Sequence, residues 1–151
     1  MRTTKQSVEN FFAQETFALV GVSRNERKFG SAIFKELTKK GYKIFPINSK
    51  MTEINGEKCY SSIKDLPEKP GGVIVCVKKD ESAKVVKEAV QLGIKNIWMQ
   101  QGSQTDEAIN YCKENNVNVV YKECVMMFAQ PVDSIHKFHR CIKKIFGALP
   151  K

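Results

Sequence analysis

An apolar run that breaks at a glycine into a basic loop is the feature that most constrains this chain. Residues 17–20, Phe-Ala-Leu-Val, have the length and composition of a buried strand, and Gly21 ends the run. A small polar loop with Arg24, Arg27 and Lys28 follows, and a helical pattern takes over after Gly30. A strand, a loop and a helix start in this order offer unpaired N–H groups and a positive dipole end, which favour phosphate. The loop is therefore a candidate anchor for a phosphorylated, nucleotide-like ligand.

Strand and helix patterns alternate along the rest of the chain. Continuous apolar runs, such as residues 73–77, are typical of parallel strands that are covered on both faces. The alternation predicts an α/β fold, a single Rossmann-like doubly wound parallel five-stranded sheet with flanking N- and C-terminal helices. Strands are expected at 17–22, 42–47, 73–77, 94–100 and 117–120, and helices at 5–14 with Ser7 as cap, at 31–40, from Asp80 or Ser82 to Gly93, and from Thr105 to about 115.

Composition limits the partners and the compartment. The chain has 151 residues with 42% hydrophobic content, which suits one domain over residues 1–151. Its net charge of +9 favours anionic partners, but it has no recognition-helix motif or interleaved aromatic platform, so nucleic-acid binding is a weaker alternative. No apolar run is long enough to cross a membrane, and the 5 scattered cysteines lack any C-x-x-C pair. We therefore expect a cytoplasmic protein with reduced thiols and no membrane contact.

Four loops follow the carboxyl ends of the first four expected strands. In an open parallel sheet, ligands bind beyond these ends, at the point where the strand order reverses. All four loops offer backbone N–H, hydroxyl, amide or ammonium donors, which suit a diphosphate and a ribose. The four loops are at residues 21–30, 48–50, 78–80 and 100–103.

The first loop differs from the standard nucleotide motifs. It lacks the G-x-G-x-x-G fingerprint of dinucleotide sites, and no G-K-[ST] follows as in a P-loop. The acidic residue expected after the second strand of an NAD site is replaced by Asn48, Ser49 and Lys50. A lysine at this position suits a phosphate better than a ribose diol, so NAD binding and ATP hydrolysis become weaker alternatives.

An ordered set of short motifs spans residues 7 to about 128. Its members are VGVSR at 20–24, KFG at 28–30, GYKIFPIN at 41–48, GEKCY at 56–60, LP at 66–67, GIKNIWMQ at 93–100, Gly102 and ECVM at 123–126. In these motifs the chain resembles the CoA-binding domain proteins, which are similar to the Rossmann-like CoA-binding domain of the succinyl-CoA synthetase α subunit. The synthetase's catalytic histidine belongs to a separate domain, so the resemblance implies CoA binding without ligase activity.

The resemblance implies that CoA or acyl-CoA lies across the same four loops. The first loop would approach the diphosphate, and Asn48, Ser49 and Lys50 would lie near the adenosine ribose and its phosphate. The third and fourth loops would line the path of the pantetheine arm. The complete set of implied binding residues is Gly21, Val22, Ser23, Arg24, Lys28, Phe29, Gly30, Asn48, Ser49, Lys50, Val77, Lys78, Gln100, Gln101 and Gly102.

The leading hypothesis is a small cytosolic protein that binds CoA or acyl-CoA and has no evident catalytic residues. No Ser-His-Asp set, paired carboxylates or metal cluster can be assembled from the spacing. The alternatives are a component of an acyl-CoA-dependent transferase or ligase that needs a partner, and an NAD(P)-binding Rossmann protein.

A few further residues have both a functional and a packing interpretation. Cys124 is interpreted as a small residue in a packed turn, with a redox role or a mixed disulfide as the alternative. Trp98 is expected in the core, and His136 and His139 are expected to pack at a surface or interface and not to bind metal. A basic amphipathic helix at about 133–147 is expected to dock on the sheet, with a homodimer interface or an anionic contact as alternatives.

Overall fold

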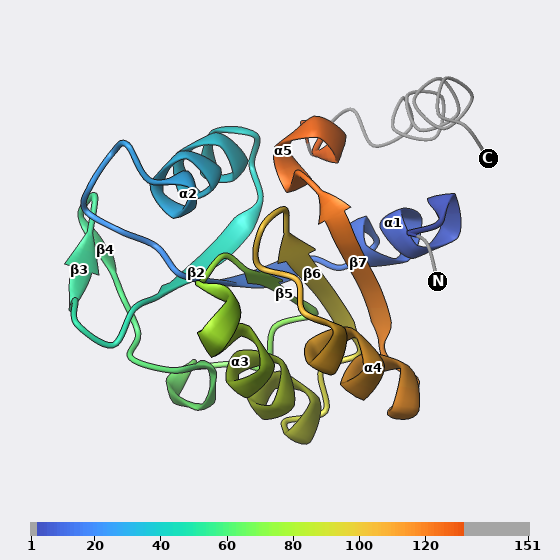
Figure 1. The fold of residues 1–151 in the computed structure, drawn as a ribbon. Coiled ribbons are helices and arrows are strands. Elements are labelled where there is room, and N and C mark those ends of the chain that lie inside the picture. The colour runs from blue at the N-terminus through green and yellow to red at the C-terminus, as the bar shows by residue number, and fades with distance from the viewer. Residues whose placement is uncertain (1–2, 132–151) are drawn as a thin grey trace.

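A parallel sheet forms the centre of the molecule (Figure 1). The computed structural model describes residues 3–131. Every neighbouring strand pair in the main sheet is parallel. The strand order is β2-β1-β5-β6-β7, so the chain moves to one side of β1 for β2 and to the other side for β5. The strands are β1 (Thr16–Val20), β2 (Lys43–Ile47), β5 (Gly72–Val75), β6 (Asn96–Gln100) and β7 (Asn118–Glu123).

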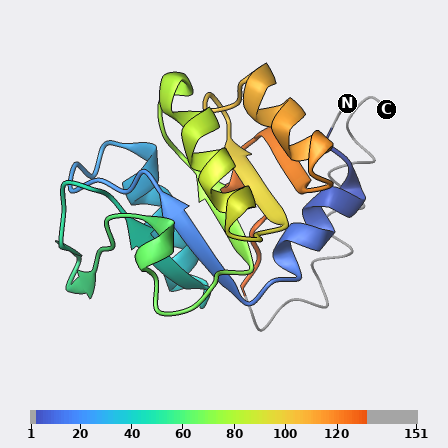
Figure 2. The ribbon, with the colours of Figure 1, turned by 90° about the horizontal axis from the view of Figure 1, so that it is seen from below.

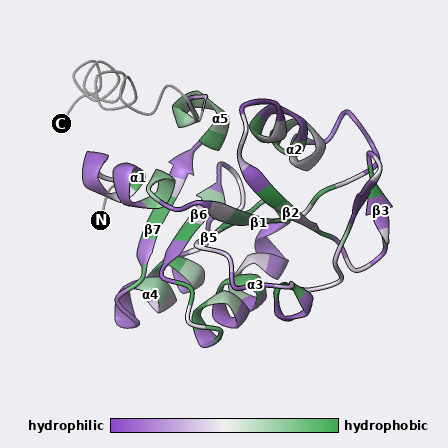
Figure 3. Cartoon of the chain, turned by 180° about the vertical axis from the view of Figure 1, so that it is seen from behind, coloured by the Kyte–Doolittle hydropathy of each residue, from purple (hydrophilic) through white to green (hydrophobic). Residues whose placement is uncertain are grey.

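Helices cover both faces of this sheet, which confirms the doubly wound α/β fold (Figure 2). One core cluster contains apolar side chains of α1, α2 and α5, and a second contains those of α3 and α4. The hydropathy colouring places much of the green in the sheet strands, while the connecting loops are largely purple (Figure 3). The helices are α1 (Lys5–Phe12), α2 (Phe29–Lys39), α3 (Lys79–Gln91), α4 (Asp106–Glu114) and α5 (Val125–Phe128).

The connection from β2 to β5 forms two small elements of its own. The Asn55-Gly56 turn joins β3 (Glu53–Ile54) to β4 (Glu57–Lys58) in an antiparallel pair. A short 3-10 turn, η1 (Ile63–Asp65), follows after Ser61 and Ser62. Tyr60 donates its backbone N–H to Pro46 at 2.9 Å, so the connection stays beside β2.

Two predicted helix starts were wrong. Helix α2 begins at Phe29 and not at residue 31, because the backbone after Lys28 already turns helical. Helix α3 begins at Lys79, with Lys78 as an N-cap whose side chain makes no capping hydrogen bond in the described structure. Ser82 is fully buried inside α3, where its hydroxyl donates to the backbone carbonyl of Ser103, so it does not cap the helix.

The last strand is longer than the predicted 117–120, since β7 continues to Glu123. Contacts with the chain's N-terminal segment support the extension: the Thr3 hydroxyl donates to the Tyr121 carbonyl at 2.8 Å and accepts from its N–H at 3.0 Å. The pairing with β6 shifts register between Trp98 and Gln100. The ladder therefore bends at the end of the strand, where Lys122 has a φ of 63°.

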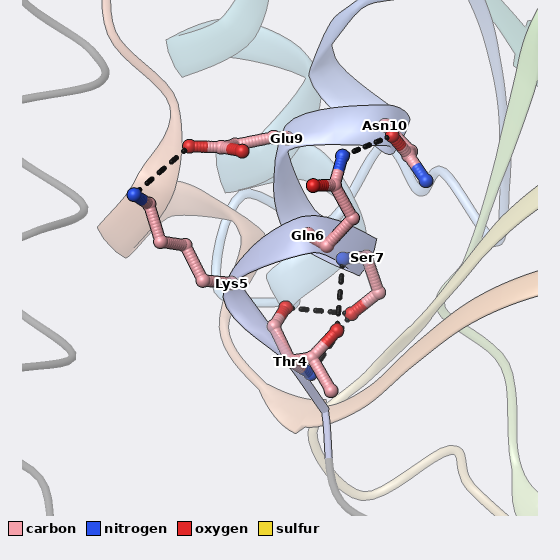
Figure 4. A network of polar contacts seen from close by, with 6 residues as sticks. All are labelled: Thr4, Lys5, Gln6, Ser7, Glu9 and Asn10. Atoms are coloured by element: carbon pink, nitrogen blue, oxygen red, sulfur yellow. Dashed lines mark hydrogen bonds and ion pairs between the residues drawn. The ribbon is translucent and has the colours of Figure 1, made fainter.

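The first helix is capped by Thr4, and the prediction that Ser7 caps it was wrong (Figure 4). The Thr4 hydroxyl accepts from the Ser7 N–H at 3.0 Å, and the Ser7 hydroxyl accepts from the Thr4 N–H at 3.0 Å. Ser7 is thus the third helical residue of a reciprocal capping box. Val8, Phe11 and Phe12 are buried on the other side of α1, which packs on β6 and β7.

We expect Thr4→Ala to lower the free energy of unfolding by about 1 kcal/mol, because the Ser7 N–H loses its acceptor. Urea unfolding followed by circular dichroism measures the change. The matched control is Gln6→Ala, which removes an exposed hydrogen bond to Asn10 in the same helix and should cost only a few tenths of a kcal/mol. Equal effects of the two variants would contradict a stabilising role for the cap.

The remaining expectations concern the C-terminal helix, membrane-spanning helices and Trp98. The helix expected at about 133–147, with His136 and His139, lies outside them. Within residues 3–131, no helix is long and apolar enough to span a membrane. Trp98 is 0% exposed on β6, which confirms that it belongs to the core.

Candidate functional site

A groove of about 950 Å³ lies at the carboxyl ends of β1, β2, β5 and β6. It spans the point between β1 and β5 where the strand order reverses, which is the usual ligand position in open parallel sheets. With the exception of Arg24, every binding residue predicted from the sequence lines this groove. Arg24 lines a neighbouring polar pocket of about 430 Å³, whose wall also contains Ser23, so the two hollows meet at the first loop.

The first loop is held in place by its own side chains. The Ser23 hydroxyl accepts from the Asn25 N–H at 3.1 Å, and the Asn25 carboxamide oxygen accepts from the Arg27 N–H at 3.0 Å. These two bonds replace the glycine-rich turns of the dinucleotide fingerprint, and they leave Arg24, Arg27 and Lys28 exposed. The loop therefore combines a hydrogen-bonded backbone with exposed positive charge.

Two glycines allow the backbone to approach closely beneath the groove. Gly21 has a φ of 111°, and a Cβ there would overlap the carbonyl oxygen of Cys76 at the end of β5. Gly30 lies in the first turn of α2, and a Cβ there would overlap the carbonyl oxygen of Gly21. Their absent side chains let the start of α2 and the ends of two strands come together at one point.

Asn48 connects the second loop to the first. Its Nδ2 donates to the Val22 carbonyl at 2.7 Å, and its Oδ1 accepts from the Lys50 N–H at 2.8 Å. Both polar ends of the amide are therefore used within the protein. Asn48 positions the loops, while the exposed Ser49 and Lys50 stay available to a ligand.

The far wall of the groove is fixed by Gln100 and Ser103. Gln100 is 3% exposed, its Oε1 accepts from the Val125 N–H at 3.0 Å, and its Nε2 lies 3.1 Å from the Cys124 sulfur. The Ser103 hydroxyl donates to the Val77 carbonyl at 2.7 Å, which ties the fourth loop to the third. Gln101 and Gly102 project between these anchors as exposed residues.

Two thiols at or near the groove have raised pKa values. Burial raises the pKa of the Cys76 thiol to about 11, and the neighbouring Cys124 contributes in the same direction. Burial also raises the pKa of Cys59, against opposing effects of the Asn48 carbonyl and of Arg24. Since the thiolate is the nucleophile, Cys76 and Cys59 are not activated for covalent chemistry in this structure.

Charge in the groove is mostly positive and comes from several elements. Arg27, Lys28 and Lys50 surround the first two loops, and Lys78 and Lys84 extend the positive wall along α3. In residues 3–131, no group of three or more His, Cys, Asp or Glu side chains could hold a metal ion. The arrangement can therefore bind an extended polyanion such as a nucleotide phosphate chain, through ammonium, guanidinium and backbone N–H groups.

One wall of the groove was missed by the sequence analysis. The signal that was overlooked is the helical spacing of positions 78, 81, 85 and 88. They are three or four residues apart, so they lie on one face of α3 and its N-cap, and all of them line the groove. Opposite them, the Ser61 and Ser62 hydroxyls donate to Asp65 at 2.6 and 2.9 Å and lower the pKa of its carboxyl group. The residues missed on this wall are Ser61, Ser62, Ile63, Glu81, Lys84, Val85 and Glu88.

Comparison with known proteins identifies the family. The model of a family described as the CoA binding domain matches residues 15–130. This chain belongs to the CoA-binding domain family. The matched range includes every strand of the sheet and all four loops of the groove. The resemblance derived from the sequence motifs is thus confirmed.

Relatives of this CoA-binding domain include large ligases and small proteins. It is 33% identical over 108 residues to acetate–CoA ligase (ADP-forming) of Methanocaldococcus jannaschii, covering 72% of this chain but 15% of the ligase. It is 28% identical over 108 residues to the uncharacterized protein YneT of Bacillus subtilis, covering 72% of this chain and 80% of YneT. A solved structure of a conserved hypothetical protein from Pyrococcus furiosus matches with TM-score 0.71 and 35% identity, covering 74% of this chain and 97% of that one. The domain therefore occurs both within ligases and as most of a small protein.

Proposed function

We propose that this CoA-binding domain binds CoA or an acyl-CoA in the groove at the carboxyl ends of its strands. The observation that carries the proposal is the convergence of four strand-end loops on one groove of about 950 Å³, whose charged lining residues are mostly cationic. The volume falls within the range of small-molecule and cofactor sites. Family membership supports CoA as the specific ligand.

In this proposal the backbone around Gly21 and the exposed cations of the first loop bind the diphosphate. Asn48 holds the second loop so that Ser49 and Lys50 meet the ribose and its 3′-phosphate. Phe29, which is 64% exposed at the groove, offers an apolar surface to the ligand. Val77, Lys78, Gln101 and Gly102 line the pantetheine path.

Thermal unfolding with a panel of ligands tests the proposal. A ligand at a hundred times its dissociation constant stabilises the folded state by about 2.7 kcal/mol, which raises the midpoint by about 5–10 °C for a domain of this size. The panel contains CoA, dephospho-CoA, acetyl-CoA, NAD, NADP and ATP. We expect CoA and acetyl-CoA to give the largest rise and dephospho-CoA a smaller one. A rise with NAD or NADP and none with either form of CoA would contradict the proposal.

Lys50→Ala then tests how the 3′-phosphate is recognised. Losing an ammonium–phosphate contact should weaken CoA binding about tenfold and leave dephospho-CoA binding nearly unchanged. The matched control is Lys35→Ala, which removes an exposed lysine of α2 outside the groove and should leave both affinities unchanged. Equal weakening of CoA and dephospho-CoA by Lys50→Ala would place Lys50 away from that phosphate.

A ligase or transferase role with a partner is the second candidate, because the chain is similar to part of an acetate–CoA ligase. Under that role, this protein supplies the CoA site and a further protein or domain supplies the catalytic group. Turnover of acetyl-CoA by the pure protein would favour catalysis by this chain itself. CoA binding without turnover would exclude catalysis by this chain alone and is expected under both the binding role and the partnered role.

A further inference from the structure

Lys78 lines the groove where the chain passes from β5 into α3. Hydrogen bonds on both sides hold its backbone. The Val77 carbonyl before it accepts from the Ser103 hydroxyl at 2.7 Å, and the Lys78 carbonyl accepts from the Glu81 N–H at 3.0 Å. The Lys78 side chain is exposed. The residue therefore combines a backbone fixed at the groove wall with an amine that is open to the ligand space.

The ammonium group of Lys78 makes no ion pair within residues 3–131. None of the four ion pairs found there includes it, and its side chain does not cap α3. Lys87 of the same helix differs, because its Nζ lies 2.6 Å from Glu107 Oε1, and the hydrogen bond and charge of this carboxylate raise the pKa of Lys87. A carboxylate partner keeps an amine protonated and hence not nucleophilic. Lys78 is free of the contact that suppresses the reactivity of Lys87.

Four lysines in the described part of the chain line the groove, and they lie at different places along it. Lys28 and Lys50 belong to the first and second loops, which are proposed for the diphosphate and the ribose. Lys84 lies farther along α3. Lys78 is at the third loop, which together with the fourth lines the proposed pantetheine path. An acyl-CoA carries its thioester at the far end of that arm, so Lys78 is the groove lysine on the side of the thioester.

We propose that Lys78 is a site of self-acylation, at which a bound acyl-CoA transfers its acyl group to Nζ. The inference rests on the proposed function, because the groove must hold the acyl-CoA for the transfer to occur. Binding converts a bimolecular encounter into a reaction between groups that are held together, which raises the effective concentration of the amine at the thioester. The substrate class is any CoA thioester whose acyl group fits beside the third loop.

The transfer needs no further reactant. The lone pair of the neutral Nζ attacks the thioester carbonyl carbon, a C–N bond forms, and the C–S bond breaks with its electron pair left on sulfur. One proton leaves the nitrogen and one is taken up by the sulfur, so the products are an amide and the free thiol of CoA. The modification removes one positive charge from the groove wall. It stops after one acyl group per protein, which separates it from catalytic turnover.

Acetylation of the purified protein by acetyl-CoA, followed by peptide mass spectrometry, tests the inference. We expect Lys78 to be acetylated at least about tenfold faster than Lys84 and Lys87, because only the Lys78 amine is held beside the thioester. The rate at Lys78 should saturate with acetyl-CoA, and excess CoA should suppress it by competition. It should also rise with pH, since the neutral amine is the nucleophile.

The control donor is the acetyl thioester of N-acetylcysteamine, which keeps the thioester and the end of the pantetheine arm but has no phosphates and no base. With this donor, Lys78 should be acetylated at a rate similar to that of Lys84. The same preference for Lys78 with both donors would show that Lys78 is reactive without a bound nucleotide and would overturn the inference.

Lys78→Arg keeps the positive charge but lacks the reactive amine, and Lys84→Arg is the matched control in the same groove. Lys78→Arg should lose the fast acetylation step, whereas Lys84→Arg should keep it. Peptide mapping of the wild-type protein identifies the acceptor independently of how well the variants bind. A fast step that persists in Lys78→Arg would overturn the assignment.

The failures of the two proposals are distinguishable. Thermal stabilisation by acetyl-CoA with equal acetylation of Lys78, Lys84 and Lys87 would overturn self-acylation and leave the CoA site standing. Fast acetylation of Lys28 or Lys50 in place of Lys78 would put the thioester at another loop and overturn Lys78 as the acceptor. Absence of stabilisation by both CoA and acetyl-CoA would overturn the two proposals together.

Discussion

Replacing Gly30 with alanine is expected to destabilise the protein by about 3 kcal/mol, although alanine is the better helix former. In an exposed helix interior, Gly→Ala stabilises by up to about 1 kcal/mol. Here the new Cβ would overlap the backbone carbonyl of Gly21, and backbone cannot move aside as a flexible side chain can. The start of α2 must therefore move away from the first loop. Urea unfolding measures the change in the free energy of unfolding. A decrease indicates that the close backbone packing dominates, whereas an increase would indicate that helix propensity dominates.

The same substitution should weaken CoA binding at least about tenfold, because the first loop loses the backbone geometry that the phosphates require. Gly56→Ala is the matched control. Gly56 has a φ of 79° in the β3–β4 turn, and a Cβ added there would have no described neighbouring atom within 4 Å. It should cost only the left-handed backbone strain, about 1 kcal/mol, and leave CoA affinity unchanged. A neutral or stabilising Gly30→Ala would contradict the packing account.

Truncating Trp98 to alanine is expected to lower the free energy of unfolding by about 3–5 kcal/mol. Trp98 is fully buried on β6, with the rings of Phe11, Phe12 and Phe128 at 5.3, 5.6 and 5.7 Å between centroids. Its indole N–H also donates to the Glu123 carbonyl at 3.1 Å, so the variant leaves a cavity and removes a hydrogen bond. Circular dichroism is the appropriate readout, since the chain has 1 tryptophan and the variant loses that fluorescence.

Leu92→Ala provides the comparison for Trp98→Ala. Leu92 is 39% exposed at the end of α3, and its truncation should cost less than about 1 kcal/mol. The stability cost of Trp98→Phe should fall between the costs of Leu92→Ala and Trp98→Ala, because phenylalanine keeps an aromatic ring but loses the indole donor. A cost for Trp98→Ala that matches the cost for Leu92→Ala would contradict the aromatic cluster as a centre of stability.

The sequence was sufficient to locate the five strands of the main sheet, but not the end of β7 or every helix boundary. Leu19 and Ile74 are fully buried in two central strands, and the apolar runs that contain them have few alternatives in an alternating α/β chain. The start of α2 was missed because Phe29 is exposed and Gly30 is a weak helix former, so neither residue carries a helical pattern. The approach of Gly30 to Gly21 determines this boundary, and that is a tertiary contact.

The groove shows the same division between local and long-range information. Its loops could be located because the carboxyl ends of parallel strands meet at one edge of a sheet. The wall formed by Ile63 and Glu88 depends on how the segment after β4 folds back against α3, and no local pattern encodes that contact. Glu88 looks like an ordinary surface residue of an amphipathic helix until its buried oxygen is seen.

Amide hydrogen exchange with and without saturating CoA tests the central claim most directly, since it reports where the ligand protects the backbone. We predict slower exchange in the four strand-end segments at 21–30, 48–50, 78–80 and 100–103, and in the segment 61–63, which lines the same groove. The exposed turn at 55–56 should be unchanged. Protection confined to other parts of the chain, or no protection at millimolar CoA, would contradict a CoA site in this groove.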